Sequence, residues 1–174
     1  MTTHNALPKT IKTERLTLRA PRMDDLADIV VMANNPKMLQ TTATLPHPYG
    51  DSDAMDFVTQ AQSGQLHAYA IVGADDRFMG TILFKYRQGE PPEIGYWLGE
   101  PHWGQGFAGE AVAALVGAVG HIQGFADIEA RVLESNPASV RVLEKAGFAI
   151  VEKTLSVLDR HRGKPVLVLR WSAR

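Results

Sequence analysis

The sequence predicts a single mixed α/β domain of the α+β type, residues 1–174, with a mostly antiparallel sheet flanked by helices. Three strand-like segments follow one another between residues 66 and 99, joined by turns too short to hold a helix. Elsewhere strand-like and helix-like segments alternate, and the apolar fraction of 45% is that of an ordinary globular protein. The sequence shows no repeat, low-complexity tract or linker that would divide the chain further.

The first third of the chain predicts one strand and two helices. The strand alternates apolar and polar side chains, as half-buried strands do, and Pro21 ends it. The first helix has apolar side chains at helical spacing behind two aspartates, which suit the positive end of the helix dipole. The second helix follows a loop with two prolines, and its expected cap is Asp51 or Ser52. These elements are expected at residues 11–20, 23–35 and 51–62, with the loop at 41–50.

The remainder predicts a three-stranded meander, two helices and three further strands. The second of these helices has the clearest signals: Ser135 or Asn136 as its cap, Pro137 in its first turn and Gly147 at its carboxyl end. The segment DRHRGK joins the last two strands as a hairpin. The meander is expected at 66–74, 78–87 and 92–99, the helices at 106–122 and 135–148, and the other strands at 126–135, 148–158 and 165–171.

Charge and composition exclude several classes of protein. With 18 basic and 19 acidic side chains the net charge is -1, so we expect neither a nucleic-acid nor a membrane partner. Cysteine is absent, and the 6 histidines include no pair at the helical spacing of metal ligands, so no metal is expected. The amino terminus lacks the apolar core of a secretory signal, and the longest apolar run, 111–120, is too short to span a membrane. We therefore expect a cytoplasmic protein.

The stretch HWGQGFAGEA, residues 102–111, places three glycines directly ahead of a predicted helix. Glycines let the backbone approach a ligand closely, and the amides at a helix start carry about half a positive charge, which favours a phosphate. The phosphate loop of NTPases is excluded, because Glu110 and Ala111 stand where lysine and serine or threonine are required. A glycine-rich turn that binds nothing remains an alternative.

A dinucleotide site is the second nucleotide interpretation of this loop. GQGFAG satisfies the G-x-G-x-x-G pattern, and Glu129 and Glu134 lie about where an acid that binds ribose should stand. However, that motif needs a buried strand running straight into its first glycine, and Pro101 interrupts the approach here. Too little chain follows to complete a doubly wound domain, which disfavours this interpretation.

The segment EIGYWLGEPHWGQGFAGEA resembles the acyl-CoA-binding core of the GNAT superfamily of N-acetyltransferases. The family pattern R/Q-x-x-G-x-G/A falls on residues 103–108, where Trp103 replaces the usual first residue. That tryptophan, with TERLTLRAPRMDD, EIGYWL and NPASVRVLEKAGF, is similar to the branch that acetylates amino termini of ribosomal proteins. These ordered blocks cover nearly the whole chain, and the resemblance implies a sheet splayed into a V.

The resemblance also implies acetyl-CoA as cosubstrate and assigns its contacts. Backbone amides of one turn would hold the pyrophosphate, and the backbone of Trp97 and Leu98 would pair with the pantetheine arm. Asn136 matches an asparagine that faces the cofactor, and a capping role is compatible with that. Tyr96, Trp97 and Trp103 are expected in the core or lining the pocket. The turn comprises Trp103, Gly104, Gln105, Gly106, Phe107, Ala108 and Gly109.

Acetyl transfer to an amine needs a neutral amine and a proton for the departing thiolate. An α-amine is neutral about once in seven molecules at pH 7, and a lysine side chain only about once in 2,500. Glu93 resembles the family glutamate that acts as base through water, the alternative being a solvent-facing or ion-paired strand residue. Leu143 occupies the position of the usual tyrosine acid, and Ser139 resembles the replacement serine, the alternative being a part in helix capping.

The sequence thus predicts direct attack by a primary amine on acetyl-CoA, with a protein or peptide amino terminus as the expected acceptor. The alternatives are a small amine, such as a metabolite, polyamine or antibiotic, and a CoA-binding module without chemistry. His47 and Tyr49 are expected in a plain surface loop, and residues 160–162 in a solvated basic tip, although the family places both near the acceptor. Relatives are often dimers, which leaves a homodimer as an open expectation.

Overall fold

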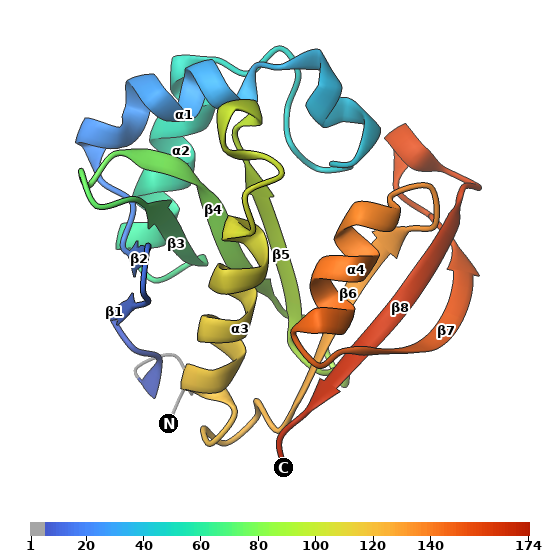
Figure 1. Cartoon of the computed structure of the whole chain (residues 1–174). Coiled ribbons are helices and arrows are strands. Elements are labelled where there is room, and N and C mark those ends of the chain that lie inside the picture. Colours follow the sequence, from blue (N-terminus) through green and yellow to red (C-terminus); the bar gives the residue numbers. More distant parts are fainter. Residues whose placement is uncertain (1–5) are drawn as a thin grey trace.

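The computed structural model describes residues 6–174, in which eight strands form one mixed sheet of order β1-β2-β3-β4-β5-β6-β8-β7 (Figure 1). All neighbouring strands are antiparallel except β5 and β6. This is the predicted α/β fold with a mostly antiparallel sheet. The strands are β1 (Thr10–Lys12), β2 (Thr17–Arg19), β3 (His67–Val72), β4 (Phe78–Lys85), β5 (Glu93–Leu98), β6 (Asp127–Leu133), β7 (Ala149–Leu155) and β8 (Pro165–Ser172).

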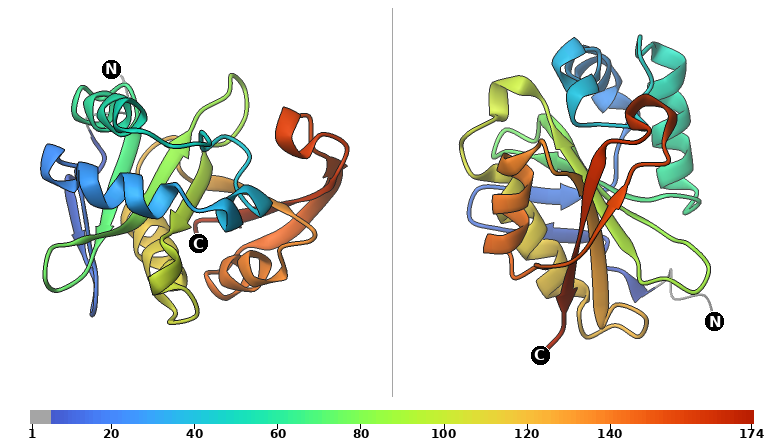
Figure 2. Two further views of the ribbon diagram at one scale, coloured as in Figure 1. Left: turned by 90° about the horizontal axis from the view of Figure 1, so that it is seen from above. Right: turned by 90° about the vertical axis from the view of Figure 1, so that its right-hand side faces the viewer.

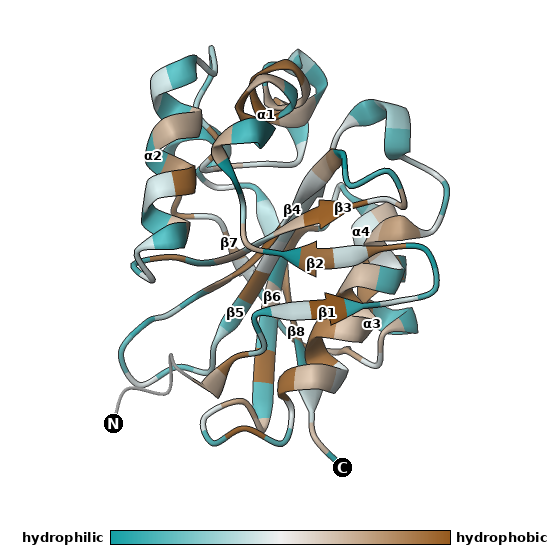
Figure 3. Cartoon of the chain, turned by 90° about the vertical axis from the view of Figure 1, so that its left-hand side faces the viewer, coloured by the Kyte–Doolittle hydropathy of each residue, from teal (hydrophilic) through white to brown (hydrophobic). Residues whose placement is uncertain are grey.

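Two pairs of helices cover opposite faces of the sheet (Figure 2). α1 and α2 pack on β3 and β4 around Ile29, Val58 and Phe78, and α1 is the more apolar of the two (Figure 3). α3 and α4 bury the larger cluster, which includes Leu115 and Leu143. The helices are α1 (Leu26–Ala33), α2 (Asp51–Gln62), α3 (Phe107–Val119) and α4 (Pro137–Lys145), with the 3-10 turns η2 (Met23–Asp25), η3 (Pro36–Gln40), η4 (Glu100–His102) and η5 (Asp159–His161).

The small residues of α3 let its end approach the sheet closely. A Cβ atom at Gly120, directly after the helix, would collide with the indole of Trp171 on β8. Ala111 and Val112, near the start of the helix, are fully buried in the same cluster. Since interiors are close-packed, side chains larger than these would push α3 off the sheet.

The sheet splits between β5 and β6. Their only paired residues within the described chain are Glu93 and Glu129, supported by a hydrogen bond of 2.9 Å from the Glu129 amide to the Pro92 carbonyl. In contrast, β5 pairs with β4 along its whole length, and β6 does so with β8. The two halves of the sheet therefore meet at one end and diverge toward the other, which gives the expected V (Figure 1).

Two local predictions are wrong. Residues 11–20 form the hairpin β1–β2 instead of one strand, because the Thr13 hydroxyl bonds to the Leu16 amide at 2.9 Å and turns the chain. The cap of α2 is Gly50, whose amide donates to the Asp53 carboxylate at 2.8 Å, and not Asp51 or Ser52. The other helices and strands lie where the sequence predicts them, within a few residues at their ends.

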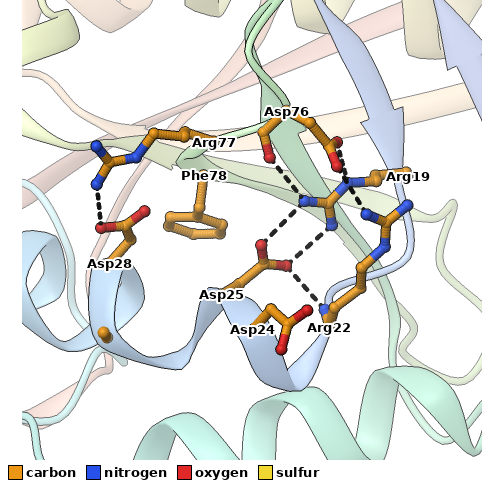
Figure 4. Close-up of a pocket in the computed structure, with 9 residues that line it drawn as sticks. Arg19, Arg22, Asp24, Asp25, Asp28, Asp76, Arg77 and Phe78 are labelled. Atoms are coloured by element: carbon orange, nitrogen blue, oxygen red, sulfur yellow. Dashed lines mark hydrogen bonds and ion pairs between the residues drawn. The ribbon is translucent and has the colours of Figure 1, made fainter.

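An ion-paired cluster ties the edge of the sheet to the start of α1 (Figure 4). Arg19, only 6% exposed, donates to both carboxylate oxygens of Asp25 at 2.9 Å and to Asp76 Oδ1 at 2.8 Å. Its hydrogen bond is the main reason why the pKa of Asp76 lies below the ordinary value. Arg19, Arg22, Asp25 and Asp76 are linked by these ion pairs and hold β2, the β3–β4 turn and η2 together.

Replacing Arg19 by leucine is expected to lower the free energy of unfolding by about 3–5 kcal/mol, since Asp25 would stay buried without its partner. Urea denaturation measures this loss. The matched control is Arg77→Leu, which removes an exposed pair with Asp28 and should leave the midpoint nearly unchanged. Equal, small effects of both variants would contradict a structural role for the buried pair.

Candidate active site

The glycine loop between β5 and α3 is open on its outer side. Gly104 and Gly106 have φ angles of 72° and 81°, in the left-handed region that favours glycine. Apart from the neighbouring backbone, a Cβ atom at Gly104 or Gly109 would meet no atom within 4 Å, whereas one at Gly106 would lie 3.4 Å from Arg15 Nη2, so the loop is open beside Gly104 and Gly109. Within residues 6–174, no side chain caps the amino end of α3. The loop can therefore present main-chain amides to an anion, as the sequence predicts.

Two side chains hold the loop in place, Trp103 from within it and Arg15 from the β1–β2 turn. Trp103, 41% exposed, donates its indole N–H to the Leu98 carbonyl at 2.7 Å. Arg15 donates to the Gln105 carbonyl at 2.9 Å, and its guanidinium carbon lies 4.4 Å from the centre of the Phe107 ring. Gln105 and Phe107 also line a pocket of about 580 Å³. The loop is thus a preformed surface feature beside a hollow.

Glu110 holds Arg15 beside this loop. Its carboxylate accepts hydrogen bonds from the Thr13 hydroxyl at 2.6 Å, the Arg15 amide at 2.8 Å and the Arg15 side chain at 2.7 Å. The β1–β2 hairpin is thereby fastened to the first turn of α3. No sequence pattern indicates this contact, because 95 residues separate Arg15 from Glu110.

The strand β5 borders the split with two kinds of side chain. Tyr96 and Leu98 face α3 and α4, whereas Trp97 packs on the other face, with its ring centre 5.7 Å from that of Phe78. Beyond Glu93, no described residue of β6 pairs with this edge of β5. On this edge of β5 the Leu98 carbonyl accepts the Trp103 indole, and the other backbone groups that point away from β4 are available to an extended ligand lying in the split.

A hydroxyl pair spans the split on the face of α3 and α4. The Tyr96 and Ser139 oxygens lie 2.5 Å apart, one on β5 and the other in the first turn of α4. The Asn136 side chain caps α4 by accepting the Ser139 amide at 3.3 Å, which confirms the predicted capping role. Burial raises the pKa of Tyr96 above its ordinary value, so its hydroxyl keeps its proton at neutral pH.

Glu93 lies where the two strands still meet, on the opposite face from Ser139. Its carboxylate accepts hydrogen bonds from Arg131 at 2.9 Å and lies 2.8 Å from Arg87. An ion-paired strand residue is the alternative interpretation of Glu93, and the structure contains these ion pairs. Burial outweighs the nearby charges of Arg87 and Lys85 and raises the pKa of Glu93 above its ordinary value.

The hairpin tip between β7 and β8 grips the loop between α1 and α2, across the open end of the V (Figure 1). Arg160 donates to the Thr42 and Leu45 carbonyls, each at 2.7 Å. His161 is 2% exposed, and its Nε2 lies 2.8 Å from the Leu39 carbonyl oxygen. The prediction of a solvated basic tip is wrong for these two residues, because loops more than 100 residues apart in sequence meet here.

The loop at 41–50 is likewise not a plain surface loop throughout. Tyr49 is only 5% exposed and belongs to the cluster under α1 and α2, whereas His47 is exposed as predicted. Burial raises the pKa of Tyr49 to about 12. The ring of Tyr49 anchors the loop in the core, and the surrounding sequence does not indicate that this side chain is buried.

Residues 6–174 contain no group of three or more histidine, cysteine, aspartate or glutamate side chains able to hold a metal ion. None of the helices described there is long and apolar enough to cross a membrane.

Three known structures share this fold. The microcin C7 self immunity acetyltransferase MccE, solved with acetyl-CoA and AMP, has a TM-score of 0.82 at 18% identity, covering 95% of this chain and 97% of that one. RimL, a ribosomal L7/L12 α-N-protein acetyltransferase solved with CoA, has a TM-score of 0.81 at 19% identity, covering 94% of this chain and 97% of that one. A spermidine N-acetyltransferase from Vibrio cholerae, solved with CoA and spermine, has a TM-score of 0.77 at 19% identity, covering 92% of this chain and 96% of that one. At such identities the likeness establishes the fold.

Sequence comparison establishes the family. The family model of the acetyltransferase (GNAT) domain matches residues 15–149. An uncharacterized N-acetyltransferase p20 from Bacillus licheniformis is 30% identical over 172 residues, covering 94% of this chain and 95% of that protein. With the split sheet and the open glycine loop, these matches show that the chain belongs to the GNAT family and is an acetyl-CoA-dependent N-acetyltransferase acting on amines.

Proposed function

We propose that the acceptor is the α-amino group of a protein or peptide, which attacks the acetyl group of bound acetyl-CoA directly. The observation that carries this proposal is that the proposed base, Glu93, is a carboxylate ion-paired with Arg87 and Arg131. Even with its pKa raised by burial, a carboxylate is a weaker base than a lysine or polyamine nitrogen, so an acceptor that is already partly neutral suits this site best. An α-amine of pKa about 7.8 is already partly neutral at pH 7, whereas a lysine or polyamine nitrogen near 10.4 is not.

The positions of the candidate residues in the fold support the following roles. The amides of residues 103–109 bind the pyrophosphate, and the backbone of Trp97 and Leu98 pairs with the pantetheine arm in the split. Asn136 faces the cofactor while it caps α4. Ser139 donates a proton to the departing thiolate, and Glu93 takes the proton of the amine through water. Holding the two reactants together supplies much of the rate, so no covalent intermediate is required.

A small amine such as a polyamine is the second candidate, favoured by the fold shared with the spermidine N-acetyltransferase. A polyamine carries several positive charges and is recognised by unpaired carboxylates. On the open face beside Glu93, the acidic groups are paired with arginines: Arg87 contacts Glu93, and Arg170 donates to Glu129 at 2.6 Å. This balanced charge favours the peptide amino terminus.

Measuring the release of the CoA thiol from acetyl-CoA tests the proposed acceptor and the proposed roles of Ser139 and Glu93. A peptide with a free amino terminus should support turnover, whereas an amino-terminally blocked lysine peptide and spermidine should support little. Ser139→Ala and Glu93→Gln should each reduce kcat by about 10²-fold or more, with CoA affinity retained. Full activity of either variant would remove that residue from the mechanism, and a clear preference for spermidine would replace the proposed acceptor.

The pH dependence discriminates between acceptor classes independently. For an α-amine, kcat/KM should rise about tenfold per pH unit and level off near pH 8, because the neutral fraction saturates above a pKa of about 7.8. For a lysine or polyamine nitrogen the rise should continue to about pH 10. A continued rise with the peptide substrate would show that another group limits the rate.

Arg160→Ala is expected to raise the KM for the acceptor several-fold and leave the KM for acetyl-CoA unchanged. The reason is that Arg160 holds the loop at 41–50 over the side of the sheet away from α3 and α4. Arg162→Ala, which removes only an exposed contact with Asp159, is the matched control. If both variants behave like the wild type, the hydrogen bonds of Arg160 to this loop have no part in acceptor binding.

A further inference from the structure

The hydroxyl of Tyr96 has no role in the proposed reaction, yet it lies beside the proposed acid. Its oxygen is 2.5 Å from the Ser139 oxygen, although 43 residues and the split of the sheet separate the two side chains. The ring of Tyr96 packs against the cluster of α3 and α4, and this packing fixes the direction of its hydroxyl. The contact is therefore built into the fold.

The direction of this hydrogen bond decides what Ser139 can do. Each hydroxyl carries one proton, so one member of the pair donates and the other accepts. If Ser139 donated to Tyr96, it would have no proton left for the departing sulfur. A phenol is the stronger acid of the two, and this favours Tyr96 as donor.

We propose that Tyr96 is a positioning residue that donates its hydrogen bond to the Ser139 oxygen and so directs the serine proton into the split. This inference rests on the proposed role of Ser139 as acid. Asn136 fixes the backbone of the serine, and Tyr96 fixes the orientation of its hydroxyl. Such chains of hydrogen bonds polarise one another, and the serine becomes a better donor than it would be alone.

The step balances in atoms and charge. The amine nitrogen forms a bond to the acetyl carbon, the carbon–sulfur bond breaks, and its electron pair stays on the sulfur. The Ser139 proton moves to the sulfur while the Tyr96 proton moves to the serine oxygen. The proton that the amine releases passes through water to Glu93, and exchange with solvent then deprotonates Glu93 and reprotonates Tyr96, so the products are the amide and free CoA.

A merely structural role must be separated from this one, because the same contact also bridges the two halves of the sheet. Tyr69→Phe provides the matched control. Tyr69 is a buried tyrosine on β3, 5% exposed, whose hydroxyl donates to the Pro8 carbonyl at 2.6 Å, away from the split. Tyr96→Phe, the test variant, and Tyr69→Phe each remove one hydroxyl from a packed ring and leave the ring itself.

The experiment compares wild type, Tyr96→Phe, Ser139→Ala, the double variant and Tyr69→Phe, with kcat, KM for acetyl-CoA and CoA affinity measured for each. We expect Tyr96→Phe to lower kcat about tenfold or more with KM and CoA affinity unchanged, and Tyr69→Phe to match the wild type. In the Ser139→Ala background, removing the Tyr96 hydroxyl should cost nothing more, since both act through one proton.

Two results would overturn the inference: Tyr96→Phe as active as Tyr69→Phe, or a loss of the same size in both backgrounds. The comparison uses whichever amine the wild type acetylates. The proposed acceptor is therefore judged on the wild type, the acid role of Ser139 on its single variant, and the role of Tyr96 on the double variant.

Discussion

The single residue pair between β5 and β6 determines the architecture of the site. Parallel strands that remained paired would fill each other's hydrogen bonds and leave no edge for a ligand. Here Glu93 and Glu129 close one end, and each strand relies on its outer neighbour beyond that point. The ion pairs among Glu93, Arg131 and Glu129 reinforce this junction from the open face of the sheet. The split is thus built into the strand pairing of the sheet.

Everything with a proposed chemical role lies around this split. The amino ends of α3 and α4 lie on the same face of the sheet, one on each side of the gap (Figure 1). One presents open amides, and the other presents the hydroxyl of Ser139. The hairpin tip with Arg160 lies across the open end and grips the loop that follows η3. Cofactor and acceptor would therefore meet at the centre of the sheet from different directions.

The sequence predicted the features that depend on local chemistry. Alternating strands, the capped helix after Asn136 and the glycine loop follow from neighbouring residues, and nearly all of them are present. It did not predict contacts between distant segments, such as Tyr96 with Ser139 or Arg160 with the loop at 41–50, because neither partner carries a signal of the other. It also missed the β1–β2 turn, in which Thr13 bonds locally to Leu16 and is held by Glu110 far along the chain.

A crystal structure with acetyl-CoA tests the central claim most directly, namely that the split between β5 and β6 is the cofactor site. We expect the pantetheine arm between these strands, the pyrophosphate on the amides of residues 103–109, and the sulfur within hydrogen-bonding reach of the Ser139 oxygen. A cofactor bound outside the split, or a sulfur distant from Ser139, would contradict it.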